Sequence, residues 1–290
     1  MKFSVIIIFF FSQLLLSQSI KIEEKIILSK AISETSGIIY IEDQKEILTF
    51  NDSGGKSELY VLKASSGKIK RIIEVKNASN VDWESITQDK DFIYIGDTGN
   101  NYGNRKNLVI YKVAKHDIKK HNKVEAEKIY YSYENQKTFV KENHNSNFDC
   151  EAITIYKNQL YLFTKNWKDN QTNIYVLPTK PGVYQAHKTR FLSINCLLTS
   201  IAYNSSTDSF IGTAYDKNYQ SYILKVKNFK TVPQISKISL TATLGYSNQT
   251  EAIAWKNNHQ IYVTREASEK TLNGKHYKRK QKLFLITLID

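Results

Sequence analysis

The 290-residue chain has few of the residues that punctuate or cross-link a polypeptide: two cysteines, three prolines and 11 glycines. Two cysteines cannot build a disulfide scaffold or a four-cysteine zinc site. So little proline and glycine leaves no room for an interdomain linker rich in both. The sequence also lacks GxxxxGK[S/T], GxGxxG, HExxH and GxSxG motifs, which excludes the common phosphate loops, zinc peptidases and serine-hydrolase elbows. We therefore expect one folded domain, residues 20–290.

A long hydrophobic run occurs only at the N-terminus. Lys2 precedes the apolar stretch Val5–Leu16, and the small, polar residues Ser17–Ser19 follow it. This order is typical of a secretory signal peptide, which we predict for residues 1–19. A membrane anchor is the alternative, but a spanning helix needs about 20 apolar residues. We expect a secreted or periplasmic monomer with no transmembrane segment after cleavage.

Basic residues exceed acidic ones by 41 to 28, giving a net charge of +13, yet arginine is scarce. Specific nucleic-acid sites favour arginine, whose planar head binds bases and phosphates with two hydrogen bonds. The scattered lysines instead indicate a solvated surface, and we expect no specific nucleic-acid partner. The dense run Lys275–Lys282 (KHYKRKQK) would either contact anionic polymers or lipid headgroups, or form a solvated hairpin.

Short strand-like segments and an internal repeat predict the fold. No stretch longer than about eight residues keeps apolar positions at helical spacing. One phrase recurs as SETSGIIY, DWESITQD, DCEAITIY, LLTSIAYN and QTEAIAWK, and two further strand-like segments follow each copy. Repeats of about 50 residues built from strands are typical of propeller blades. The sequence thus predicts an all-β protein, a β-propeller.

Five phrases predict five blades. Six is the alternative, because the longest interval between phrases is 67 residues and contains the polar segment Glu134–Asn147, which we expect to be a rim loop. The last repeat ends one strand short, whereas Ile20–Leu28 precedes the first repeat without a partner. We expect this N-terminal strand to complete the last blade, which would remove an open sheet edge.

Aligning the phrases on their middle residue predicts a ring of carboxylates. The innermost strand of each propeller blade lines the central channel, so this residue should face the channel mouth. Asp82 and Asp149 precede two of these positions and should help. The candidate metal ligands are Glu34, Glu84, Glu151, Glu251, Asp82 and Asp149, and Thr199 takes the same position in the fourth repeat.

Crowded carboxylates need compensation. A hard cation, Ca²⁺ above all, is one source, because it prefers six to eight oxygen ligands. Protein cations and hydrogen bonds to neighbouring backbone are the others, and general acid–base catalysis by the glutamates is a further reading. The sequence leaves these alternatives open.

A second aligned column follows the next strand. It supplies the candidate ligand-binding residues Asp52, Asp97, Lys165 and Arg265, to which we add Thr199. The turns NDSGG and GDTGNN place Asp52 and Asp97 beside residues that tolerate left-handed backbone, so a plain turn role is the alternative. The six histidines fall mostly in polar, loop-like stretches, which argues against a histidine metal site.

Cys150 and Cys196 stand near the start of consecutive repeats. They would either form a disulfide in an oxidising compartment or remain two buried thiols.

The middle of the chain resembles a known family. From Asp82 to Pro178 the sequence is similar to exported β-propellers related to the SdiA-regulated and esterase-like-phytase propellers. The matching residues are Asp82-Trp83-Glu84, Gly96-Asp97, Gly99-Asn100-Asn101, Arg105, Asp149, Glu151-Ala152 and Thr164-Lys165. The resemblance implies an extracytoplasmic propeller, with divalent-cation binding and phosphoester hydrolysis as further implications.

Two functions follow as hypotheses. The first is a propeller that binds a cation, or a small polar or anionic ligand, at the channel mouth. The alternative is a metal-assisted phosphoesterase or esterase-like hydrolase, in which Lys165 and Arg265 clamp an anion beside the metal. Whether the protein is an enzyme stays open at this point.

Overall fold

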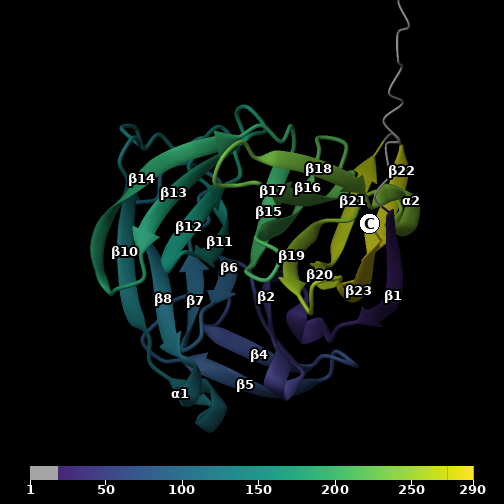
Figure 1. Cartoon of the computed structure of the whole chain (residues 1–290), viewed down its shortest axis with the longest axis horizontal. Helices are drawn as coiled ribbons and strands as arrows, with labels where there is room; N and C mark the ends of the chain where they lie inside the picture. The colour runs from purple at the N-terminus through teal and green to yellow at the C-terminus, as the bar shows by residue number, and fades with distance from the viewer. Residues whose placement is uncertain (1–18, 273, 290) are drawn as a thin grey trace, which may run out of the picture.

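The computed structural model describes residues 19–272 and 274–289, which form an all-β protein (Figure 1). The predicted signal peptide, apart from Ser19, lies outside the described residues. No helix in the described part of the chain is long and apolar enough to cross a membrane.

The strands form four large sheets and one hairpin. The first sheet contains β2 (Thr35–Ile41), β3 (Glu46–Asn51), β4 (Glu58–Lys63), β5 (Ile69–Val75) and β9 (Lys123–Val124). An eight-stranded sheet contains β6 (Trp83–Gln88), β7 (Phe92–Asp97), β8 (Leu108–Ala114), β10 (Glu127–Tyr133), β11 (Cys150–Tyr156), β12 (Gln159–Thr164), β13 (Thr172–Pro178) and β14 (Gly182–Leu192). The next contains β15 (Leu197–Asn204), β16 (Ser209–Tyr215), β17 (Ser221–Lys227) and β18 (Gln234–Ser239).

The last large sheet joins the two ends of the described chain. It contains β19 (Thr250–Trp255), β20 (Gln260–Arg265), β23 (Lys282–Ile289) and β1 (Ser19–Ile27). The N-terminal strand pairs antiparallel with β23, from Ser19 opposite Ile289 to Ile27 opposite Lys282. The predicted addition of the N-terminal strand to the last repeat is confirmed.

Short elements connect the sheets. They are the 3-10 helices η1 (Lys30–Ile32) and η2 (Glu42–Gln44), the helices α1 (Lys115–Lys120) and α2 (Thr241–Leu244), and the hairpin of β21 (Ser268–Leu272) and β22 (Lys275–Arg279). Most of the basic run Lys275–Lys282 thus lies in this hairpin. The segment between β10 and β11 contains no strand, as expected for the predicted rim loop.

The first strand of each repeat lies near the centre of the molecule (Figure 1). β2 packs against β6, β6 against β11, β11 against β15, β15 against β19, and β19 again against β2, so these strands form a closed cycle. Apolar side chains fill the spaces between neighbouring sheets: Trp83 of β6, for example, packs edge-on against Phe50 of β3 at 5.5 Å between ring centroids. The cycle brings residues far apart in the sequence to one axis.

All five central strands contain a β-bulge at the same place. Their pairing with the next strand shifts by one residue at Ser36, Glu84, Glu151, Thr199 and Glu251. A bulge inserts one residue into a strand and re-aims its side chain, and bulges are common beside functional sites. The repeated phrase in the sequence therefore encodes a repeated backbone irregularity.

One sheet connection has no counterpart in the sequence prediction. β10 pairs in parallel with β14, from Ile129 opposite Gly182 to Tyr133 opposite Ala186, and this joins two four-stranded halves into the eight-stranded sheet. The halves correspond to the second and third repeats.

Candidate functional site

A cavity of about 440 Å³ opens where the bulged ends of the central strands meet. Its lining is mostly polar. Acidic residues, one buried lysine and Tyr215 come from the strand ends, and further aromatic and basic residues come from the surrounding loops and the β21–β22 hairpin. The lining residues are Ser36, Asp52, Glu84, Asn101, His144, Glu151, Lys165, Trp167, Asn170, Leu197, Tyr215, Asp216, Lys217, Tyr219, Gln249, Glu251, Glu266 and Lys270.

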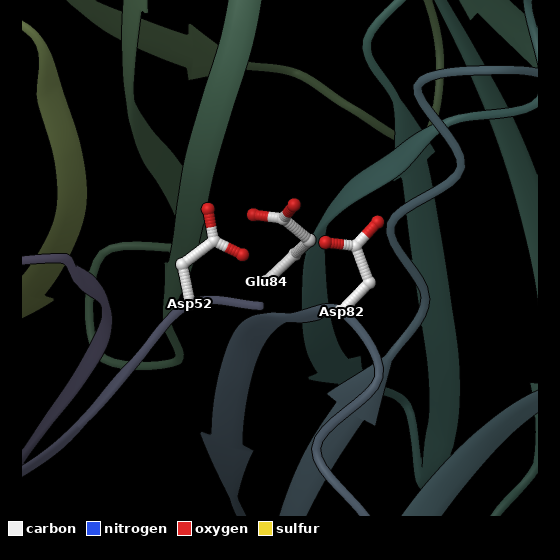
Figure 2. Close-up of side chains that lie close together, drawn as sticks. All are labelled: Asp52, Asp82 and Glu84. Atoms are coloured by element: carbon white, nitrogen blue, oxygen red, sulfur yellow. The ribbon is translucent and has the colours of Figure 1, made fainter. Parts of the chain in front are cut away.

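Three carboxylates converge on one side of this cavity (Figure 2). Asp52 follows β3, Asp82 precedes β6, and Glu84 is the bulged residue of β6. One oxygen from each lies within 4.8 Å of the other two. Glu84 Oε2 also accepts a hydrogen bond of 2.9 Å from Ser36 Oγ on the neighbouring central strand. Two neighbouring sheets thus supply the trio Asp52, Asp82 and Glu84.

Gly99 leaves the space that two of these carboxylates occupy. A Cβ atom at position 99 would lie 2.4 Å from Asp82 Cγ and 2.7 Å from Glu84 Oε1. Both distances are far below van der Waals contact. The backbone N–H of Gly99 donates to the carbonyl of Asp82 at 3.2 Å, which holds the loop against the carboxylates. Any larger residue here would push the trio apart.

Burial and crowding raise the pKa of every member of the trio. Burial raises the pKa of Asp52 to about 8, and the nearby Asp82 carboxylate is the second cause. Burial first, and then Asp149, raises the pKa of Asp82 to about 6. Glu84 is buried, and its pKa lies well above the usual value because of burial and then Asp52. Without a cation, the protein must therefore hold protons on this side of the cavity near neutral pH.

Glu151 differs from the trio because it has a basic partner, Lys165, although burial still raises the pKa of Glu151 well above its usual value. Its Oε1 lies 3.1 Å from the ammonium of Lys165, and both residues are buried. Although burial works in the opposite direction, Glu151 raises the pKa of Lys165 well above its usual value. The ammonium also lies over the rings of Trp167, at 4.8 Å from the centroid, and Tyr215, at 5.1 Å. Lys165 is thus a fixed positive charge inside the cavity.

A second acidic pair lies beside this lysine. Glu251 is the bulged residue of β19, and Glu266 follows β20 in the same sheet. Burial raises the pKa of Glu251. Burial first, and then Glu251, raises the pKa of Glu266 to about 8.

Aromatic and basic side chains form the rest of the wall. His144 stacks on Trp167 with 3.7 Å between ring centroids, and Tyr215 stacks on Tyr219 at 5.7 Å. Lys270 of the β21–β22 hairpin lies over the Tyr219 ring at 3.8 Å. His144 and Tyr219 both have left-handed backbone, with φ of 53° and 55°. Such backbone is uncommon for side chains of this size and often occurs at functional sites.

The structure brings six predicted site residues together: Asp52, Asp82, Glu84, Glu151, Lys165 and Glu251. Glu34 is not among them. It is exposed, and its backbone rather than its carboxylate holds the local turn: its N–H donates to Asn51 Oδ1, and its carbonyl accepts from the N–H of Asp52. The bulged residue of this strand is Ser36, two positions later. The expected glutamate ring is therefore wrong at the first repeat.

Asp97 and Arg265 do not line the cavity. Each is the last residue of its strand and pairs with the first residue of a central strand. Successive side chains on a strand point to opposite faces, so Glu266, which follows Arg265, lines the cavity instead. Thr98, which follows Asp97, does not line it and donates to the carbonyl of Cys150. Asp97 forms an ion pair of 2.8 Å with Arg105, and Arg265 donates to the carbonyl of Lys280.

Thr199 and Asp149 are structural staples. Thr199 Oγ1 donates to the carbonyl of Thr250 at 2.7 Å, which ties β15 to β19. The carboxylate of Asp149 accepts from the backbone N–H of Asn100 at 2.6 Å and from Trp167 Nε1 at 2.8 Å. Both side chains are buried, and neither lines the cavity.

Cys150 and Cys196 are free, buried thiols, so no disulfide joins them. Burial raises the pKa of Cys150 to about 12 and that of Cys196 to about 11. Both therefore stay protonated and inert in the folded protein.

Most of the other cavity residues escaped the sequence prediction, among them Ser36, Tyr215, Glu266 and His144. Ser36 and Glu266 stand at positions equivalent to predicted ones once the bulge fixes the register: Ser36 corresponds to Glu84, and Glu266 corresponds to Asp52. Aligning Ile38 with Ile86 in the sequence would have found Ser36. His144 comes from the predicted rim loop, for which the repeat gives no signal.

Comparisons with known proteins identify no family. No protein-family model matches the chain, and no curated protein matches it. Among solved structures, a luciferin-regenerating enzyme is similar to it over 91% of this chain and 95% of that chain, with 9% sequence identity and a TM-score of 0.49.

Proposed function

We propose that this protein is a five-bladed β-propeller that binds a divalent cation, Ca²⁺ above all, in its central cavity. The convergence of Asp52, Asp82 and Glu84 carries the proposal. Two oxygens that bind the same Ca²⁺ at 2.3–2.6 Å lie at most about 5 Å apart. The oxygens of the trio lie within 4.8 Å of one another and meet this requirement.

The closed cycle of central strands supports the propeller part of the proposal, with the last blade completed by β1. In this description the eight-stranded sheet is two blades joined at their outer strands.

The chemistry of the trio fits a hard cation. All three ligands are carboxylates, which suit Ca²⁺ or Mg²⁺ rather than Zn²⁺ or Cu²⁺. No lysine or arginine of the described chain forms an ion pair with Asp52, Asp82 or Glu84, although Lys165 does so with Glu151 in the same cavity. A bound cation would stabilise ionised carboxylates that otherwise take up protons.

The remaining volume suits a small polar or anionic ligand that completes the coordination of the cation. Lys165 and Lys270 both line this volume, as do the polar side chains of Asn101 and Gln249. Together with the predicted export, this supports a binding role outside the cytoplasm.

Isothermal titration of chelator-treated protein with CaCl₂ tests the proposal. We expect saturable binding of one ion per chain, lost in Glu84→Gln and kept in the matched control Glu58→Gln, whose carboxylate is ion-paired on β4. Binding of Mg²⁺ should be weaker, because Mg²⁺ requires stricter geometry. Absence of binding at millimolar Ca²⁺ in the wild type would refute the proposal.

A metal-assisted phosphoesterase or esterase-like hydrolase is the second candidate. The observation in its favour is Glu266, whose raised pKa would let it donate a proton near neutral pH. Ca²⁺-dependent turnover of p-nitrophenyl phosphate or an acyl ester, lost in Glu266→Gln, would assign this function. Equal background rates for wild type and Glu266→Gln would refute it.

A further inference from the structure

A second cavity, of about 250 Å³, lies at the far ends of the strands that carry the cation trio. Ser36 is the second residue of β2 and Asp52 follows β3, whereas Ile41 ends β2 and Glu46 starts β3. At about 3.3 Å per residue, these two ends are roughly 17–20 Å apart. The lining residues are Ile41, Asp43, Gln44, Glu46, Leu48, Arg71, Lys90, Ile93, Lys115, Ile118 and Lys119.

The helix α1 belongs to a crossover that covers this cavity. After β8 the chain leaves its own sheet, forms α1, and pairs β9 in parallel with β5 of the first sheet. It then returns as β10, antiparallel to β8. Lys119 of α1 forms an ion pair of 2.8 Å with Asp43 of η2. Two sheets, η2 and α1 therefore enclose the cavity, and α1 lies beside β5 at the edge of the molecule (Figure 1).

The floor of this cavity is aliphatic. Leu48 of β3, Ile93 of β7 and Ile118 of α1 are exposed by 2%, 1% and 4%, and Ile41 packs against the same core. The side chains that form the floor are rigid because they belong to the packed core between the first two repeats. A ligand tail placed here would contact apolar side chains from both sheets and from the helix.

The rim of the cavity is basic. Each of its two acids has a lysine partner: Asp43 pairs with Lys119, and Glu46 pairs with Lys70. Lys115 Nζ donates to the backbone carbonyl of Asp89. Both acids of the rim are therefore compensated by lysines.

Within the described residues three rim cations have no ion-pair partner: Arg71, Lys90, and Lys115, which donates only to the carbonyl of Asp89. Within residues 19–272 and 274–289 the structure records no ion pair for Arg71 or Lys90. Arg71 donates only to neutral oxygens, the carbonyl of His121 at 3.3 Å and Asn122 Oδ1 at 3.4 Å. The rim thus keeps three positive charges that an incoming anion would compensate, those of Arg71, Lys90 and Lys115.

We propose that this cavity binds a small amphipathic anion, namely a carboxylate head on an aliphatic tail, with the head between Arg71 and Lys90 and the tail on the Leu48–Ile93–Ile118 floor. Its volume equals that of about eight water-sized groups at ~30 Å³ each, which sets the tail at medium length. Arginine suits a carboxylate because its planar head can donate two parallel hydrogen bonds. The proposal does not depend on the cation site.

Titration calorimetry with sodium octanoate tests it. We expect saturable binding of one octanoate per chain, at least tenfold weaker binding of acetate for want of a tail, and no binding of octylamine, whose head is cationic. The double variant R71A/K90A should bind octanoate at least tenfold more weakly, and the double variant K56A/K63A, which removes two exposed lysines of the same sheet, should bind it like the wild type.

Two controls separate the outcomes. The thermal midpoint of R71A/K90A should match that of the wild type, since both side chains lie on the rim. The variant Asp52→Asn should bind octanoate like the wild type, because the cation site lies at the opposite ends of the strands. Equal binding of octanoate and octylamine, or unchanged binding in R71A/K90A, would overturn the proposal.

Discussion

The substitution Asp52→Asn should stabilise the protein without a cation and destabilise it, relative to the wild type, with one. Asparagine keeps the shape of the side chain and can still accept the hydrogen bond from the backbone N–H of Ser53. It removes one negative charge from the trio. The same change therefore relieves repulsion in the free protein and deletes a ligand in the bound protein.

The sign and the pH range follow from the pKa of Asp52. Burial and then Asp82 raise this pKa from 3.8 to about 8 in the folded protein. Between about pH 4 and pH 8 the unfolded chain releases a proton that the folded protein retains, so the stability of the wild type falls as pH rises through this range. The asparagine side chain of the variant does not titrate, so its advantage in free energy of unfolding over the wild type should grow as pH rises through this range and stay constant above it.

The magnitude can be bounded. Each pKa unit corresponds to about 1.4 kcal/mol, so four units set a ceiling of about 5–6 kcal/mol. Asp82 lies within 4.8 Å and takes up part of the repulsion, and solvent reaches the half-buried Asp52. We therefore expect a gain of roughly 2 kcal/mol at pH 8. Saturating Ca²⁺ at about 100 times its Kd should stabilise the wild type by about 2.7 kcal/mol and the variant hardly at all.

Thermal melting at pH 4 and pH 8, each with chelator and with excess Ca²⁺, measures this reversal. A change of 1 kcal/mol moves the midpoint by about 2–4 °C in a domain of this size. At pH 8 the variant should melt about 4–8 °C above the wild type with chelator, and below the wild type with excess Ca²⁺. The reasoning fails if the variant melts no higher with chelator and gains as much from Ca²⁺ as the wild type.

Two further substitutions separate the shape of the site from its charge. Gly99→Ala keeps every charge but places a Cβ atom 2.4 Å from Asp82 Cγ, so calorimetry should show at least tenfold weaker Ca²⁺ binding. The control Gly55→Ala, whose Cβ atom would have no contact closer than 3.8 Å, should bind Ca²⁺ normally. Equal Ca²⁺ affinities of the two variants would contradict the role of Gly99. Thr199→Val removes the hydrogen bond to the carbonyl of Thr250, so urea denaturation should show a free energy of unfolding lower by about 1–3 kcal/mol. The Ca²⁺ affinity should not change. A weaker Ca²⁺ affinity would mean that Thr199 belongs to the binding site after all.

The sequence predicted the repeated strands and the glutamates of three repeats, because one phrase recurs with the same apolar spacing. The error at the first repeat arose from aligning identical residues. Glu34 matches the glutamate column by residue type, but Ile38 matches Ile86 by position, and the bulge makes Ser36 the equivalent of Glu84. Hydrophobic register, which determines the face of a strand, was the more reliable guide.

The second column contained an error of the same kind. Asp97 and Arg265 were placed with Asp52 and Lys165, although the first two end their strands and the last two follow theirs. Because side chains alternate along an extended chain, a shift of one residue turns each to the opposite face. Glu266 therefore takes the place predicted for Arg265, which replaces an expected positive charge in the cavity with a carboxyl group.

The rim residues could not be predicted from the repeat. His144 and Tyr219 belong to loops of different length in different repeats, and both need left-handed backbone to bring their rings to the cavity. Histidine adopts that conformation more often than most residues, whereas tyrosine does not, and the repeat gives no signal for either position. Tertiary contacts fix both positions: His144 stacks on Trp167, and Tyr219 stacks on Tyr215 beneath Lys270.

The departures from symmetry concentrate the uncompensated negative charge in one sector of the ring. Of the five bulged positions, Ser36 and Thr199 are neutral, and Glu151 is paired with Lys165. Glu251 lies beside Glu266 and is weakly compensated by Lys165 and Lys270. Only Glu84 meets two further carboxylates and no basic ion-pair partner within the described residues. The ring therefore has one strongly acidic sector, between the first two repeats, and a single cation there would compensate the charge that the protein itself leaves unpaired.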